Sequence, residues 1–189
     1  VEPQKSGKTW GWHDAAFFNM LKPMELVFGN GRLDGVKVGV ETGDVSTFTS
    51  FEEFFEAYKS QEAYMIKLMV NACNAIDRAH AIRCPLPFES CMVADCIGRG
   101  KSLQEGGAIY NFTGPQGFGI ANMTDALLAI RELVYEKKLL TLCEYKEAMD
   151  ANFGKGYRGK AAEKITVDIA KTMEAAGVTV DEKTVAAIY

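Results

Sequence analysis

The chain has 189 residues, of which 48% are hydrophobic and 24% charged, and these proportions are ordinary for a globular protein. Its net charge of −4 gives no electrostatic reason to expect nucleic-acid binding. No apolar run approaches the ~20 residues that a membrane helix needs, so we expect a cytoplasmic protein with neither a nucleic-acid nor a membrane partner.

The start of the chain carries no initiator methionine and no targeting segment. It opens Val1-Glu2-Pro3-Gln4 and continues as a polar stretch, predicted to be a loop, up to residue 13. We therefore expect the chain to be an internal piece of a longer polypeptide.

The next stretch, residues 14–28, has apolar residues at helical spacing and predicts a helix. Asp14 can cap this helix, Pro23 should kink or restart it, and Gly29 should end it. Residues 30–49 contain many helix breakers, so they are predicted to form a surface excursion with room for a short hairpin.

A capping box formed by Ser50 and Glu53 opens the longest predicted helix. This helix should end near Arg83, because Pro85 disfavours helical geometry at the residue before it. A shorter helix is predicted over residues 89–97, where glycines close it.

The second half of the chain combines one predicted strand with several helices. Residues 106–112 predict a short buried strand, and because an unpaired strand edge is costly, we expect it to pair with strands outside this sequence. The remaining predictions are helices over 124–137, 141–152 and 161–176, a Gly-rich linker at 154–159, and a short helix after 181.

The glycine-rich stretch Gly114–Gly119 superficially resembles a phosphate loop. It lacks both the Lys-Ser/Thr ending of a Walker motif and the glycine order of a dinucleotide site. A tight backbone path past a partner or substrate is therefore favoured over phosphate binding.

The five cysteines are odd in number and no pair has the C-x-x-C spacing. The favoured interpretation is reduced thiols that act as small apolar residues, and the alternative is one reactive cysteine among them. No metal site is predicted. His80 lies on the apolar face of the long helix, where a core histidine is the favoured interpretation.

Three polar residues near the start, Glu2, His13 and Asp14, form the most plausible site. His13 and Asp14 are adjacent in a glycine-bounded loop before a predicted helix. The alternative interpretation, in which Asp14 is only a helix cap, explains part of this pattern.

Seven stretches carry a resemblance to a known family: residues 1–4, 7–9, 11–19, 79–81, 84–88, 95–116 and 150–154. Together they resemble the glycyl radical enzymes, the pyruvate formate-lyase-like superfamily. The resemblance implies that Glu2, in what remains of a Cys-Val-Glu-Pro motif, is the general base and that Asp14, with His13 beside it, binds substrate. It also implies an α/β fold, a ten-stranded barrel of two half-barrels to which this mostly helical segment adds one or two strands. Residues 1–189 would form one internal segment of that domain, with no second domain.

The spacing from Glu2 to Asp14 is similar to that of the B12-independent glycerol and propanediol dehydratases, which implies elimination of water from a small vicinal diol. Other radical lyases stay open as alternatives: isethionate sulfite-lyase, choline trimethylamine-lyase, arylacetate decarboxylase and formate C-acetyltransferase. An alternative of another class is a helical binding protein that stands alone and catalyses nothing.

The same resemblance implies the partners. This segment would bind no cofactor, and the glycyl radical elsewhere in the full-length protein would be installed by an S-adenosylmethionine-dependent activating enzyme. The full-length protein would be a homodimer acting on a small molecule, and the chain alone would be inactive.

Overall fold

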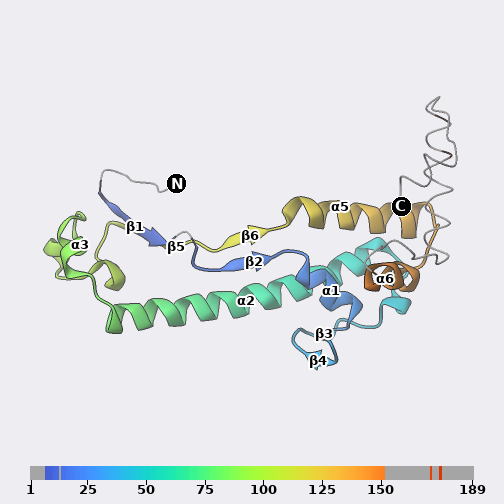
Figure 1. The fold of residues 1–189 in the computed structure, drawn as a ribbon, viewed down its shortest axis with the longest axis horizontal. Helices are drawn as coiled ribbons and strands as arrows, with labels where there is room; N and C mark the ends of the chain where they lie inside the picture. The colour runs from blue at the N-terminus through green and yellow to red at the C-terminus, as the bar shows by residue number, and fades with distance from the viewer. Residues whose placement is uncertain (1–6, 13, 152–170, 172–174, 176–189) are drawn as a thin grey trace. The chain divides into compact units, whose positions relative to one another are not determined.

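The computed structural model describes residues 7–12, 14–151, 171 and 175 (Figure 1). Helices predominate among these residues, and every strand has two to four residues. None of the described helices combines the length and the apolar character needed to cross a membrane. The chain divides into two compact units, which we describe separately. The first comprises Val1–Lys22 and Glu62–Ile120, and the second comprises Pro23–Gln61 and Ala121–Tyr189.

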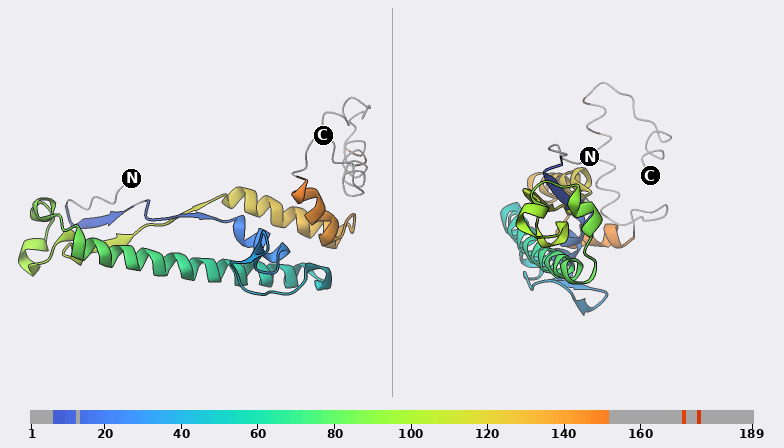
Figure 2. Two further views of the ribbon diagram at one scale, coloured as in Figure 1. Left: turned by 60° about the horizontal axis from the view of Figure 1, so that its bottom comes forward. Right: turned by 90° about the vertical axis from the view of Figure 1, so that its left-hand side faces the viewer.

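The long helix α2 (Phe51–Arg83) confirms the prediction from the capping box, and the left view in Figure 2 shows it uninterrupted. Ser50 Oγ accepts a hydrogen bond from Glu53 N (3.3 Å), as expected at a helix start. The Glu53 carboxylate, however, accepts from Thr49 N (2.6 Å), one residue farther out than predicted. Hydrogen bonds from Thr49, first from its backbone and then from its hydroxyl, hold the pKa of Glu53 below its usual value.

The prediction of a helix that begins at Asp14 is wrong over the first half of its range. A strand, β2 (Phe17–Asn19), follows Asp14, and α1 (Lys22–Phe28) begins only afterwards. Pairing with a strand from the second half of the chain wins over helical propensity here. Pro23 fits in the first turn of α1 because no intrahelical donor is needed there. The predicted N-terminal loop also contains a strand, β1 (Thr9–Trp12).

The short hairpin expected in residues 30–49 is confirmed. β3 (Arg32–Leu33) and β4 (Val36–Lys37) pair antiparallel across Asp34 and Gly35. Both turn residues have positive φ, 48° and 78°, which is the backbone that a two-residue Asp-Gly turn provides. A 3₁₀ turn, η1 (Val45–Thr47), completes this excursion.

The helix predicted over residues 89–97 is two short helices, α3 (Pro87–Cys91) and α4 (Cys96–Arg99). Asp95, just before α4, has φ 81°, a left-handed conformation that interrupts the helical path. The 3₁₀ turn η2 (Leu103–Glu105) follows, and the predicted strand is displaced toward the C-terminus as β5 (Tyr110–Thr113). A further strand, β6 (Gln116–Phe118), lies within the glycine-rich stretch.

The last described elements largely match their predictions. α5 (Ile120–Ile130) starts four residues earlier than expected and continues into the π-helix η3 (Arg131–Glu136). α6 (Leu142–Asp150) begins at the predicted capping box, where Thr141 N donates to Glu144 Oε2 (2.8 Å). The predicted linker and C-terminal helices lie outside the described residues, apart from Lys171 and Ala175, which are helical.

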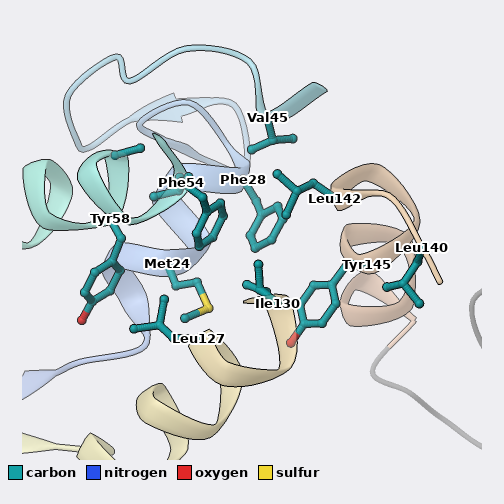
Figure 3. Packing of buried hydrophobic residues seen from close by; sticks show 12 residues of the cluster. Met24, Phe28, Val45, Phe54, Tyr58, Leu127, Ile130, Leu140, Leu142 and Tyr145 are labelled. Carbon is teal, nitrogen blue, oxygen red and sulfur yellow. The ribbon is translucent and has the colours of Figure 1, made fainter. Parts of the chain in front are cut away.

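The core of the second unit gathers aromatic and aliphatic side chains from α1, α2, α5 and α6 (Figure 3). Phe28 lies between Phe54 and Tyr145, with ring centroids 5.4 and 6.0 Å away. Burial of these aromatic side chains is the main source of hydrophobic stabilisation in this unit. Burial also raises the pKa of the Tyr145 hydroxyl.

A fully buried glutamine, Gln61, joins α2 to the loop after the hairpin. Its Nε2 donates to Val40 O (2.6 Å), and its Oε1 accepts from Val40 N (3.1 Å). Gly39 makes this close approach possible, because a Cβ at that position would lie 2.3 Å from Gln61 Oε1. One side chain thus satisfies both backbone groups of Val40.

Gln61→Leu should free both Val40 groups without a large change in volume. A buried polar group left without a partner costs about 1–3 kcal/mol, so the loop around Val40 should open more readily. Amide hydrogen exchange at residues 39–43 of the full-length protein measures this directly. Ser60→Ala is the control, since Ser60 is exposed and its hydroxyl donates to Glu56 O of its own helix (2.9 Å). Unchanged protection in Gln61→Leu would contradict the assignment.

Candidate active site

Two segments far apart in the sequence run side by side in the first unit (Figure 1). β1 pairs in parallel with β5, placing Gly11 opposite Phe112. β2 pairs in parallel with β6, placing Phe18 opposite Gly117. The strand predicted from residue 106 onward therefore has its partner within the chain, whereas we expected it to pair outside this sequence.

The pairing is interrupted between the two ladders, and the interruption is unequal. Residues 13–16 separate β1 from β2, whereas only residues 114 and 115 separate β5 from β6. Backbone hydrogen bonds between the two segments resume directly after the interruption, where Gln116 N donates to Ala16 O (2.8 Å). Extra residues on one strand disrupt the ladder and redirect side chains, an arrangement that is common beside active sites.

Asp14 lies in this interruption. Its side chain is exposed, and Gln116 Nε2 donates a hydrogen bond to Asp14 Oδ1 (2.5 Å). The helix-cap interpretation of Asp14 is wrong, because α1 begins only at Lys22. Just before this helix it is the Asn19 side chain that accepts a backbone hydrogen bond, from Leu21 N (3.0 Å). The carboxylate is consequently available for another task.

The other two predicted site residues, Glu2 and His13, lie outside the described residues. Their roles stay predictions that depend on the sequence. Asp14 is thus the predicted site residue that the structure places.

Gln116 is a residue that sequence reasoning missed. The glycine-rich stretch was interpreted only as a tight backbone path, and Gln116 was given no role. Its contact with Asp14 spans 102 residues of sequence, so no local pattern reveals it. A polar residue set between Pro115 and Gly117 is the one feature that marks the position.

A cavity of about 550 Å³ lies between the β1/β5 pair and the end of α2. The Trp12 and His80 rings stack there with centroids 4.4 Å apart, and Thr113 Oγ1 donates to Asp77 Oδ2 (2.6 Å). The core-histidine interpretation is correct in that the His80 ring packs against another side chain. It is wrong in that His80 is only half-buried. These contacts fix β1 and β5 against the helix, and so support the strand that leads to Asp14.

The cysteines carry no disulfide in the structure. Cys73 and Cys96 are buried, as expected of small apolar residues, whereas Cys84, Cys91 and Cys143 are exposed. Burial, and secondarily the neighbouring Asp95 charge, raises the pKa of the Cys96 thiol, which makes this thiol less reactive. The described part of the chain contains no group of three or more His, Cys, Asp or Glu side chains that could hold a metal ion.

Several known proteins are similar to this chain in both sequence and fold. The solved structure from work on 1,2-propanediol dehydration in Roseburia inulinivorans is 57% identical with a TM-score of 0.77, over 95% of this chain and 22% of that one. The glycerol-bound B12-independent glycerol dehydratase from Clostridium butyricum is 50% identical with a TM-score of 0.78, over 81% and 20%. The (2S)-3-sulfopropanediol dehydratase of Klebsiella oxytoca is 39% identical over 155 residues, which are 81% of this chain and 19% of that protein.

These likenesses confirm the predicted fold class, a mostly helical segment of the pyruvate formate-lyase type of α/β barrel. The chain spans about a fifth of the length of these relatives. The family model described as pyruvate formate lyase-like matches residues 1–174. The chain therefore belongs to the pyruvate formate lyase-like family, that of the glycyl radical enzymes.

Proposed function

We propose that the protein containing this chain is a glycyl radical dehydratase that removes water from a small vicinal diol such as propane-1,2-diol or glycerol. The observation that carries the proposal is the exposed Asp14 carboxylate, held by Gln116 where the strand pairing breaks. The 57% identity to a structure concerned with 1,2-propanediol dehydration supports the choice of substrate. Residues 1–189 form one internal segment of the catalytic domain, with no second domain.

Each site residue has a defined task in this proposal. A thiyl radical elsewhere in the protein takes a hydrogen atom from the carbon that bears one hydroxyl, and the carbon radical that remains makes that hydroxyl more acidic. Glu2 accepts its proton as the general base. Asp14 and His13 bind the substrate, and Asp14 orients it through a hydroxyl. The hydroxyl on the neighbouring carbon leaves as water with the proton that Glu2 accepted, and the product radical takes the hydrogen atom back from the thiol.

The proposal includes the partners of the whole protein. An S-adenosylmethionine-dependent activating enzyme installs the glycyl radical, and no cofactor binds to residues 1–189. The full-length protein acts as a cytoplasmic homodimer on a small-molecule substrate.

A substrate panel tests the proposal. The activated full-length protein should convert propane-1,2-diol or glycerol to the corresponding aldehyde, whereas the protein without its radical should convert neither. The panel also includes (2S)-3-sulfopropanediol, because its dehydratase is 39% identical to this chain, and isethionate and choline, which carry other leaving groups. Turnover of isethionate or choline with none of any diol would overturn the dehydratase proposal.

A further inference from the structure

The contact between Gln116 and Asp14 has a particular construction. Gln116 is fixed through its backbone, because it is the first residue of β6, stands opposite Phe17, and donates its N–H to Ala16 O (2.8 Å). Asp14 stands on the other segment, in the interruption, outside the registered pairs of both ladders. A residue on a fixed strand thus holds the side chain of a residue on an unpaired stretch.

The chemistry of the donor also matters. An amide N–H directs the carboxylate by a hydrogen bond but carries no charge and has no titratable proton near neutral pH. Lysine or arginine at the same place would pair with the carboxylate and compete with a substrate hydroxyl for it. Gln116 therefore fixes one oxygen of Asp14 without placing a positive charge beside the carboxylate.

We infer that Gln116 is a positioning residue, which orients the Asp14 carboxylate toward the substrate hydroxyl. This inference rests on the proposed function, in which Asp14 binds that hydroxyl. A side chain held in one orientation before substrate arrives gives up less conformational entropy on binding. The competing account is structural, in that Gln116 only ties the two segments together.

Combined variants of the activated full-length protein separate the two accounts. Gln116→Met keeps the length of the side chain and removes the donor, and it should lower kcat/KM for propane-1,2-diol about tenfold, mostly through KM. In an Asp14→Ala background the same change should do nothing further, because no carboxylate is left to orient. Rates are divided by the radical content measured by electron paramagnetic resonance, so that lost protein is not counted as lost activity.

Gln104→Met is the matched control. Gln104 is another half-buried glutamine of the first unit, and its Oε1 accepts from Leu86 N (3.1 Å). The Gln104→Met variant should leave kcat/KM for propane-1,2-diol unchanged. Gln116→Glu is a second variant that keeps the shape of the side chain. Assayed at a pH where both carboxylates are ionised, Glu at this position cannot donate and repels Asp14, so the loss should be at least as large as in Gln116→Met.

The outcomes are distinguishable. Losses that multiply in the Asp14→Ala, Gln116→Met double variant, full activity in Gln116→Glu, or an equal loss in Gln104→Met would each overturn the positioning role and leave the proposed function standing. A parent protein inactive on diols, or an Asp14→Ala variant with unchanged kcat/KM, would overturn the proposed function itself and the positioning role with it.

Discussion

Glu2→Gln should lower the turnover of the activated full-length protein by about two to four orders of magnitude, the loss typical of a missing general base. Glutamine has nearly the same size and can still hydrogen-bond to a hydroxyl, but it cannot accept its proton. Substrate binding should therefore change much less than kcat. The glycyl radical should still form, because the proposed general base acts on the bound substrate.

The experiment compares initial rates on propane-1,2-diol with the radical signal of the same sample. Glu41→Gln is the control, since Glu41 is an exposed glutamate of the second unit, paired with Lys37 Nζ (3.0 Å), and should leave turnover unchanged. Near-normal turnover of Glu2→Gln with an intact radical signal would rule out the general-base role.

Local sequence signals predicted the elements whose ends are fixed by neighbouring residues. α2 and α6 begin at their capping residues, and Ser50 and Thr141 each accept the backbone bond expected of a cap. The β3–β4 hairpin follows from Asp34 and Gly35, which supply the positive φ that its turn needs. In each case the interacting groups are five or fewer residues apart.

Elements that depend on distant partners could not be predicted in this way. The helical spacing after Asp14 is real, but Phe17 stands opposite Gln116 and the stretch is a strand. The parallel pairs join residues about a hundred positions apart, so neither periodicity nor propensity reveals them. The left-handed backbone of Asp95 divides the helix predicted over 89–97, and no feature of the sequence pattern predicts it.

The candidate site shows the same division. Local reasoning makes Asp14 a candidate site residue but leaves a helix cap as an alternative, and the resemblance between motifs implies that it binds substrate. The structure removes that alternative and supplies Gln116, whose contact with Asp14 exists only once residues 8–20 and 110–118 are brought together. Motif comparison therefore gives Asp14 its proposed role, and the strand pairing explains how its side chain is held.

Asp14→Asn should lower kcat/KM for propane-1,2-diol or glycerol about ten- to hundredfold, because hydrogen bonds to a charged group are worth about 1.5–3 kcal/mol. Asparagine keeps a side-chain oxygen that can accept the bond from Gln116 Nε2. The tie between the two segments should survive, and only the charged acceptor for the substrate hydroxyl is lost. Asp14→Asn thus separates substrate binding from a purely structural role, under which kcat/KM would stay close to that of the parent.

Steady-state rates on both diols, divided by the radical content, measure the effect, and a thermal melt of the same preparation reports on folding. Asp34→Asn is the matched control, because Asp34 is an exposed aspartate in a turn where asparagine is equally suited. A binding role predicts a large loss in Asp14→Asn, none in Asp34→Asn, and the same melting temperature in both. Parent-like kcat/KM in Asp14→Asn would show that the carboxylate charge has no part in binding the diol, and the site would then have to be sought among other residues of the full-length protein.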